Sequence, residues 1–210
     1  MITAKNLLAY SSKFKKEVPG HDGKYEYTSE ILLNDSIVHA AIITANLFEK
    51  AITEPMKTVN MYCGEFSLFR EKAQYAIDKV LSDCDKAGLS VSEEEAWKNF
   101  KPGQELLDNF TEFLKNGGTL NLIIERGDDT LKSCEIWKTL RDYIRNGQVH
   151  LSVIRESMGL GHFTATADAY RIEKSDNTKT AIGCFNDPEN AEVLNENFMF
   201  LQKISDPIAV

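Results

Sequence analysis

The sequence predicts an α/β protein with a mixed, mostly parallel sheet flanked by helices on both faces and an N-terminal helical extension. Segments with apolar residues at helical spacing alternate with short strand-like runs from residue 57 to residue 155. Such alternation is typical of parallel strands joined by helices that cover a sheet. After residue 161 the pattern becomes β-rich, which indicates a few antiparallel strands as well.

The first 56 residues are expected to form the extension, and residues 57–210 the main domain. A short helix is predicted at residues 3–15, followed by a polar loop. A long helix is predicted at residues 28–52, because apolar residues recur there at helical spacing and Pro55 ends the region. This helix is expected to pack on the main domain or on another subunit.

The main domain is predicted to begin with three strands and three helices, with two helices between the first and second strands and one between the second and third. The strands are expected at residues 59–63, 119–125 and 149–155, and the helices at 66–87, 103–116 and 131–146. A glycine follows each of these helices, as is common at helix C-termini. The β-rich part is predicted to contain a strand or tight strand pair at 162–173, a turn at 174–177, a strand at 180–184, a helix from Asp187-Pro188 and a last strand at 198–203.

The composition argues against several classes of protein. The net charge is −8, from 24 Lys and Arg against 32 Asp and Glu, which makes a monomer a poor non-specific binder of nucleic acid. The four cysteines are widely spaced and no histidine pair has ligand spacing, so we expect no metal and no cofactor. No apolar run approaches the ~20 residues of a membrane span. Free thiols and the absence of a signal-peptide core predict a cytoplasmic protein.

A histidine-containing segment in the last quarter of the chain carries the strongest functional signal. His162 starts the predicted hairpin, and Gly183 and Asn186 stand at the end of the following strand. This arrangement resembles the phospholipase D-like superfamily, whose motif is His-x-Lys-x4-Asp on a hairpin, then a Gly-Ser-x-Asn strand end and a helix. The chain departs from that motif at the lysine, which is Thr164, and at the aspartate, because Asp168 comes one residue early.

The resemblance implies phosphodiester chemistry with a histidine nucleophile and a second histidine as the acid, supplied by another copy of the motif. A lysine neutralises the phosphate oxygens in the transition state. A chain with one motif would therefore form a two-fold dimer with the histidine near the axis. By this resemblance the catalytic candidates are His162, Asp168 and Asn186.

Candidate substrate-binding residues come from two places in the sequence. Thr164 stands at the lysine position, and the residues that could supply the missing charge are Arg171, Arg155 and Lys179. Without such a replacement, the loss of a preorganised donor lowers a rate by about 10²–10³. A degenerate, non-catalytic member of the superfamily is therefore favoured over an active one.

A second set of polar residues follows the predicted parallel strands. Glu65 and Ser67 come just after the first strand, and Glu125 ends the second. In open parallel sheets, ligands bind beyond the carboxyl ends of the strands. These residues and the end of the 149–155 strand therefore predict one crevice.

Each candidate also has a structural interpretation. His162 is also typical of a hydrogen-bonded histidine at the start of a strand, and Asp168 of a solvated turn residue. Asn186 and Asp187 suit a turn and a helix cap, and Ser67 suits the cap of the next helix.

Two functions follow from these residues. The first is a degenerate phospholipase D-like domain, a pseudoenzyme that acts as a homo-oligomeric binding or assembly subunit. By analogy it would belong to a complex that handles nucleic acid, such as a bacterial defence complex, with a protein partner. The alternative is a metal-independent phosphodiesterase or nuclease that works as a homodimer through a phospho-histidine at His162. The binding module predicts an exposed apolar surface, for which the helix at 28–53 is the candidate.

Overall fold

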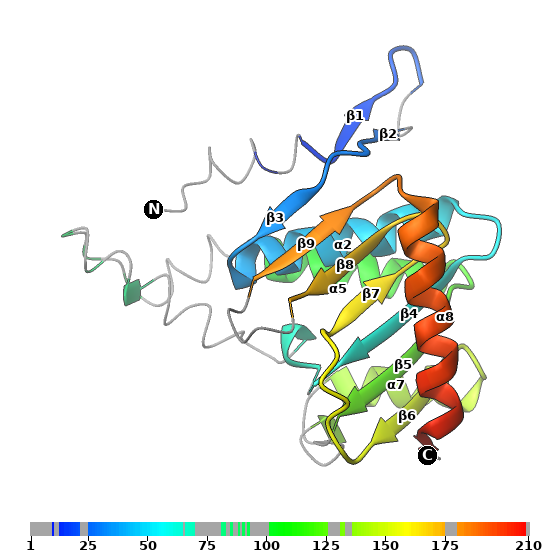
Figure 1. Cartoon of the computed structure of the whole chain (residues 1–210). Coiled ribbons are helices and arrows are strands. Elements are labelled where there is room, and N and C mark those ends of the chain that lie inside the picture. The colour runs from blue at the N-terminus through cyan, green and yellow to red at the C-terminus, as the bar shows by residue number, and fades with distance from the viewer. Residues whose placement is uncertain are drawn as a thin grey trace.

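An eight-stranded mixed sheet forms the centre of the molecule (Figure 1). Its strand order is β10-β6-β5-β4-β7-β8-β9-β3. In the computed structural model the described residues are 10, 13–21, 25–64, 66–69, 81–82, 85, 88, 90, 92, 101–125, 131–132, 136–174 and 180–208. The predicted α/β class with a mixed sheet is confirmed.

Parallel pairing is confined to three strands of this sheet. These are β4 (Thr58–Cys63), β5 (Thr119–Glu125) and β6 (Val149–Ile154), all close to the predicted bounds. The remaining described strands pair antiparallel, so the expectation of a mostly parallel sheet was wrong in this detail. They are β7 (Phe163–Ala165), β8 (Tyr170–Glu173), β9 (Ala181–Cys184), β3 (Leu32–Asn34) and the two-residue β10 (Asp206–Pro207).

Helices lie on both faces of the sheet, as the sequence predicts. On one face pack α2 (Ile37–Thr53), α5 (Lys101–Lys115) and α7 (Ile136–Arg145), and α8 (Pro188–Ile204) lies on the other (Figure 1). Successive side chains of the parallel strands point to opposite faces of the sheet. Met61 of β4 belongs to the core cluster of α2 and α5, whereas its neighbour Tyr62 belongs to the cluster of α8.

α8 begins where the sequence predicts, but it extends further than predicted. The Asp187 side chain accepts a hydrogen bond from the backbone N–H of Asn190, and Pro188 occupies the first turn. The expected strand at 198–203 is wrong. Phe198 and Leu201 continue the helical spacing of buried residues that Ala191 and Leu194 begin, so the helix runs on to Ile204.

The predicted 28–52 helix begins nine residues late. Leu32 and Asn34 are buried and alternate with an exposed Leu33, which is the period of a strand, and this segment is β3. Ser36 then caps α2 by accepting from the backbone N–H of His39. The expectation of an exposed apolar surface on α2 was wrong, because most of its side chains are buried against α5 and the sheet.

The N-terminal part also contains a short hairpin that the sequence did not predict, formed by β1 (Lys15–Glu17) and β2 (Tyr25–Tyr27). Most of the helices predicted at 3–15 and 66–87 falls outside the described residues. Within the second range, the described residues show a 3-10 turn η1 at Ser67–Phe69 and helical backbone at 81–82 and 85. The division between residues 1–56 and 57–210 stays a prediction. No helix among the described residues is both long and apolar enough to cross a bilayer.

The hairpin of β7 and β8 positions the candidate site. It confirms the expected strand pair at 162–173, and β7 runs antiparallel to β4 with Phe163 opposite Tyr62. The start of β7 and the end of β8 therefore lie at the same edge of the sheet as the carboxyl ends of β4, β5 and β6. The sequence predicts a crevice at this edge.

Candidate functional site

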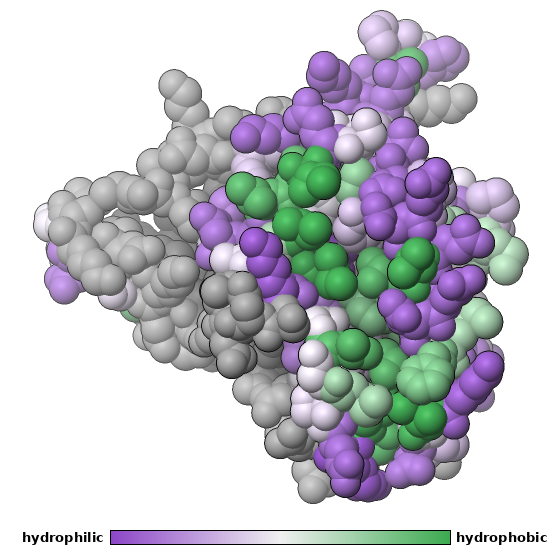
Figure 2. Space-filling view, in the orientation of Figure 1, coloured by the Kyte–Doolittle hydropathy of each residue, from purple (hydrophilic) through white to green (hydrophobic). Residues whose placement is uncertain are grey.

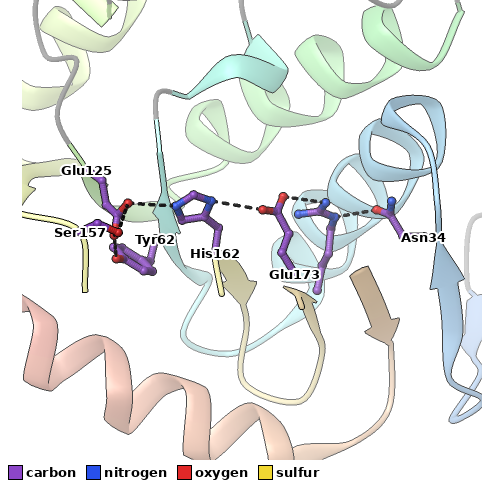
Figure 3. A network of polar contacts seen from close by, with 7 residues as sticks. Asn34, Tyr62, Glu125, Ser157, His162 and Glu173 are labelled. Atoms are coloured by element: carbon purple, nitrogen blue, oxygen red, sulfur yellow. Dashed lines mark hydrogen bonds and ion pairs between the residues drawn. The ribbon is translucent and has the colours of Figure 1, made fainter. Parts of the chain in front are cut away.

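His162 lies at this edge between two carboxylates from different strands (Figure 3). Its Nδ1 is 3.2 Å from Oε2 of Glu173, the last residue of β8, and its Nε2 is 3.4 Å from Oε2 of Glu125, the last residue of β5. The backbone N–H of Glu173 donates to the His162 carbonyl at 2.8 Å. The hairpin pairing thus fixes both the backbone of the histidine and one partner of its ring.

Glu125 collects several donors around its carboxylate. The Tyr62 hydroxyl donates to it from β4, and the Ser157 hydroxyl and the Met158 backbone N–H donate from the loop after β6, each at 3.2 Å. Two segments, β4 and the loop after β6, therefore hold the Glu125 carboxylate beside the His162 ring. Its side chain is only 11% exposed.

Arg171 extends the same network toward the edge strand β3. It stands directly opposite Thr164 in the β7–β8 pair, and its Nη2 donates to Oε1 of Glu173 at 3.0 Å. Its Nε donates to the side-chain oxygen of Asn34 at 2.8 Å. A continuous chain of polar contacts, shown in Figure 3, therefore runs from Asn34 through the histidine to Tyr62. The guanidinium lies on the strand next to the lysine position of the motif.

The charges of this network support one another. Hydrogen bonding to Glu173 raises the pKa of His162 above its ordinary value, and this outweighs the lowering by burial. Burial alone would raise the pKa of both glutamates. The hydrogen bonds that Glu125 accepts from Tyr62, Met158 and His162, and those that Glu173 receives from His162 and Arg171, lower their pKa instead. The two carboxylates thus favour the protonated form of the ring.

A cavity of about 250 Å³ opens beside the histidine. His162, Arg171 and Glu173 form its polar side, and its apolar side includes Phe66 and Phe69 of the segment after β4. Gly64 lines it too, and a Cβ there would lie 3.2 Å from Cε1 of the His162 ring. The absence of a side chain at position 64 therefore leaves space for the imidazole.

The structure places Asp168 and Asn186 away from this cavity. β7 runs between His162 and Asp168, and Asp168 forms an ion pair with Lys50 at the end of α2. Asn186 is exposed and lines a separate cavity together with Asp168 and Lys50. The prediction that these two residues act together with His162 therefore has no support from the polar contacts of the described residues.

The other predicted residues lie partly within reach of the site. Thr164 is buried and lines the His162 cavity, and so does Arg171. Glu65 lies outside the described residues, and of Ser67 only the backbone in η1 is described. Glu125, which the sequence places at the predicted crevice, contacts the His162 ring.

Sequence reasoning missed Glu173, Tyr62 and Asn34 as members of the network. Glu173 could have been found from the hairpin register, because residues at the two open ends of a tight strand pair are neighbours. Tyr62 and Asn34 come from distant segments and gave no signal of their own. Within the described part of the chain, no group of three or more His, Cys, Asp or Glu side chains could hold a metal ion.

Comparisons with known proteins identify the fold. No family model and no curated protein matches the chain. Among solved structures, phosphatidylserine synthase of Haemophilus influenzae, a phospholipase D family member, aligns with a TM-score of 0.50 at 11% identity over 89% of this chain and 43% of its own. Nuc of Salmonella typhimurium, described as a phospholipase D family member, aligns at 0.49 and 12% over 86% and 99%. The chain has a phospholipase D-like fold.

A third solved structure with this fold is TrmBL2, described as an archaeal chromatin protein with a novel mode of DNA binding. It aligns with a TM-score of 0.53 at 10% identity over 85% of this chain. The alignment spans about half of TrmBL2, 54% of its length. At these identities the likeness concerns the fold alone.

Proposed function

We propose that this chain is a degenerate phospholipase D-like domain that serves as a non-catalytic binding or assembly subunit. The observation that carries the proposal is the occupation of both ring nitrogens of His162 by carboxylates, Glu173 at 3.2 Å and Glu125 at 3.4 Å. A histidine nucleophile needs one nitrogen free and deprotonated to attack phosphorus. Here each nitrogen faces an anion.

The surroundings of the ring also oppose a phosphate. Two carboxylates at the imidazole repel the phosphate oxygens, and the one guanidinium beside them is already paired with Glu173 and Asn34. Thr164 is neutral where the motif has a lysine. The described residues of the site therefore lack the surplus of positive charge that stabilises a phosphoryl transition state.

An active metal-independent phosphodiesterase that works as a homodimer is the second candidate, and one observation favours it. Arg171 lines the same cavity as His162 and stands opposite Thr164, so its guanidinium lies close to where a motif lysine would project. For this candidate to hold, a substrate must draw Arg171 and His162 away from Glu173. A second His162 must also come from another copy.

The proposed setting is a cytoplasmic complex with a protein partner that handles nucleic acid, such as a defence complex. TrmBL2, which shares the fold, is described as binding DNA. The net charge of −8 argues against unassisted DNA binding by this chain, because affinity for DNA rests on phosphate neutralisation by Lys and Arg. We therefore assign contact with nucleic acid to the partner.

The proposal is tested by metal-independent turnover. Wild type, His162→Ala and the matched control His150→Ala, an exposed histidine on β6, are assayed in EDTA on bis-(p-nitrophenyl) phosphate and on single- and double-stranded DNA. Circular dichroism of each sample confirms folding. We expect no turnover above buffer from any of the three proteins.

Turnover that is present in the wild type and in His150→Ala but absent in His162→Ala would establish the second candidate. That result would identify His162 as the nucleophile and would contradict the proposal of a non-catalytic subunit.

A further inference from the structure

Apolar side chains of the described residues lie in different settings on the surface and in the cavity beside His162. Over α8 and the β3–β9 side of the sheet they are at the surface, as Figure 2 shows, and Leu33 and Phe200 are 70% and 58% exposed. In the cavity they are buried. Phe66 and Phe69 are each 3% exposed, and their rings stack with centroids 4.2 Å apart. A buried aromatic wall beside a cavity is typical of sites for small molecules.

The Thr164 hydroxyl is a polar group of this cavity that the network around His162 does not use. Thr164 lines the cavity and is only 4% exposed. No donor or acceptor among the described residues contacts its hydroxyl, whereas the buried hydroxyl of Thr166 donates to Glu54. A buried hydroxyl is unfavourable until it forms a hydrogen bond, so Thr164 favours a ligand that supplies one.

Arg171 and Glu173 flank this hydroxyl. Arg171 stands directly opposite Thr164 in the β7–β8 pair, which puts the two side chains on the same face of the sheet. Its guanidinium is 8% exposed, and its contacts with Asn34 and Glu173 use Nε and Nη2. Within the described part of the chain no group accepts from Nη1. The cavity therefore offers two kinds of donor, and the Glu173 carboxylate beside them is an acceptor.

The charged side chains around the cavity balance one another. Arg171 and the protonated form of His162 carry two positive charges, and Glu173 and Glu125 carry two negative charges. An anion in the cavity would face the Glu173 carboxylate, and a cation would face the Arg171 guanidinium. The cavity therefore favours an uncharged ligand, because a buried charge is costly unless it is paired.

We infer that this cavity binds a small uncharged molecule whose flat ring carries an amide group. The ring lies against Phe66 and Phe69. The amide carbonyl accepts from Thr164 and Arg171, and the amide N–H donates to Glu173. At about 250 Å³ the cavity is smaller than the roughly 300–1,000 Å³ of drug-sized pockets, so it suits a ligand of one ring. The inference rests on the proposed role as a binding subunit and names the chemical class of the ligand.

An NMR titration of the wild type with benzamide, benzoate and inorganic phosphate tests this inference. Benzoate has the ring of benzamide with a carboxylate in place of the amide, so the pair isolates the effect of charge. The imidazole signal of His162 reports on the cavity, and exposed His150 near the start of β6 is the internal reference. We expect benzamide to shift the His162 signal saturably, with a Kd on the order of 1 mM for so small a ligand. Benzoate and phosphate should leave it unmoved at the same concentrations.

Variants at position 164 test the role of the hydroxyl. Thr164→Val keeps the shape of the side chain without the hydroxyl, and we expect the Kd of benzamide to rise about five- to tenfold. Thr164→Ser keeps the hydroxyl and should bind benzamide as the wild type does. Thr119→Val is the matched control, since Thr119 is half-buried and starts β5 at the opposite edge of the sheet. Circular dichroism checks the folding of each variant.

A folded wild type that shows no saturable response to benzamide would overturn the inference. A response to benzoate or phosphate at lower concentrations than to benzamide would also overturn it, and so would equal benzamide affinity in Thr164→Val and the wild type. These outcomes do not depend on turnover in EDTA, so failure here is distinct from failure of the non-catalytic proposal.

Discussion

The two ends of the β7–β8 hairpin are both held by charged side chains, but they are built differently. At the turn, buried Glu54 accepts from the Thr166 hydroxyl and the Ala167 backbone N–H, and Lys50 pairs with Glu54 and Asp168. At the open end, His162 and Glu173 line a cavity, and the His162 side chain is 30% exposed. The turn is a structural clamp, whereas the open end presents an imidazole beside a cavity.

The two ends also separate residues that the sequence resemblance would group together. In this chain the histidine and the aspartate of the motif lie at opposite ends of β7 and have separate partners. Asp168 orients the end of α2 through Lys50, while Glu173 and Glu125 orient His162. Each carboxylate therefore orients the end of the hairpin that it contacts.

The largest expected effect is at the turn. Glu54→Ala removes a buried carboxylate and leaves Lys50, Thr166 and the Ala167 N–H short of an acceptor. Breaking a buried ion pair in this way typically costs about 3–5 kcal/mol. Urea unfolding should show this loss. Glu49→Ala on the same helix is the matched control, because its pair with Lys15 is partly exposed and such pairs contribute about 0–1 kcal/mol.

Equal and small losses of unfolding free energy in Glu54→Ala and Glu49→Ala would contradict the role of the turn as a structural clamp. The hairpin would then be held by backbone pairing alone.

A smaller effect is expected at the open end, with a defined pH dependence. His162→Gln removes the cation from between two carboxylates, and we expect a loss of roughly 1–2 kcal/mol. The raised pKa of His162 makes its contribution complete below 6.5 and lost as the pH rises through the raised value. The lowered pKa values of Glu125 and Glu173 make theirs complete above 4.5 and lost in acid.

The difference in melting temperature between wild type and His162→Gln should therefore be largest between pH 4.5 and 6.5. A difference that grows steadily from about pH 6 to about pH 9 would show that the ring stabilises the fold as a neutral side chain.

The smallest expected effect separates positioning from stability. Gly64→Ala places a Cβ against the His162 ring, at 3.2 Å from Cε1, where the partly exposed ring can shift by a few tenths of an ångström. The ring would then leave Glu125 while the fold persists. We expect little change in urea unfolding but a displaced His162 signal in the imidazole NMR spectrum. An unmoved signal would mean that the ring does not pack against Gly64.

The sequence could predict those parts of the fold that depend on local periodicity. Burial pattern and helix capping depend on neighbouring residues. The predictions that rest on them agree with the structure: the strands at 59–63 and 119–125 and the helix start at Asp187. The segment 28–36 was wrongly predicted as helix, since Ile31 and Leu32 fit a helical pattern as well as a strand. Pairing with β9 decides it, and such long-range pairing is not encoded locally.

The sequence could predict where the site lies but not which residues contact one another in it. The end of a strand puts Glu125 at the crevice, and the start of a hairpin puts His162 there, so both could be located. Their mutual contact depends on the register of three strands from separate parts of the chain. Asp168 was assigned by motif spacing alone, and the side chain of Lys50 contacts it across 118 residues of sequence.

The most direct test of the central claim is an NMR titration of the His162 imidazole in the wild type and in Glu173→Gln, with and without inorganic phosphate. The pair of carboxylates at the ring predicts a pKa above 6.5 in the wild type, a lower pKa in the variant and no response of the ring to phosphate. A pKa at or below 6.5, together with ring signals that shift on addition of phosphate, would contradict this arrangement and indicate a histidine open to a phosphoryl group.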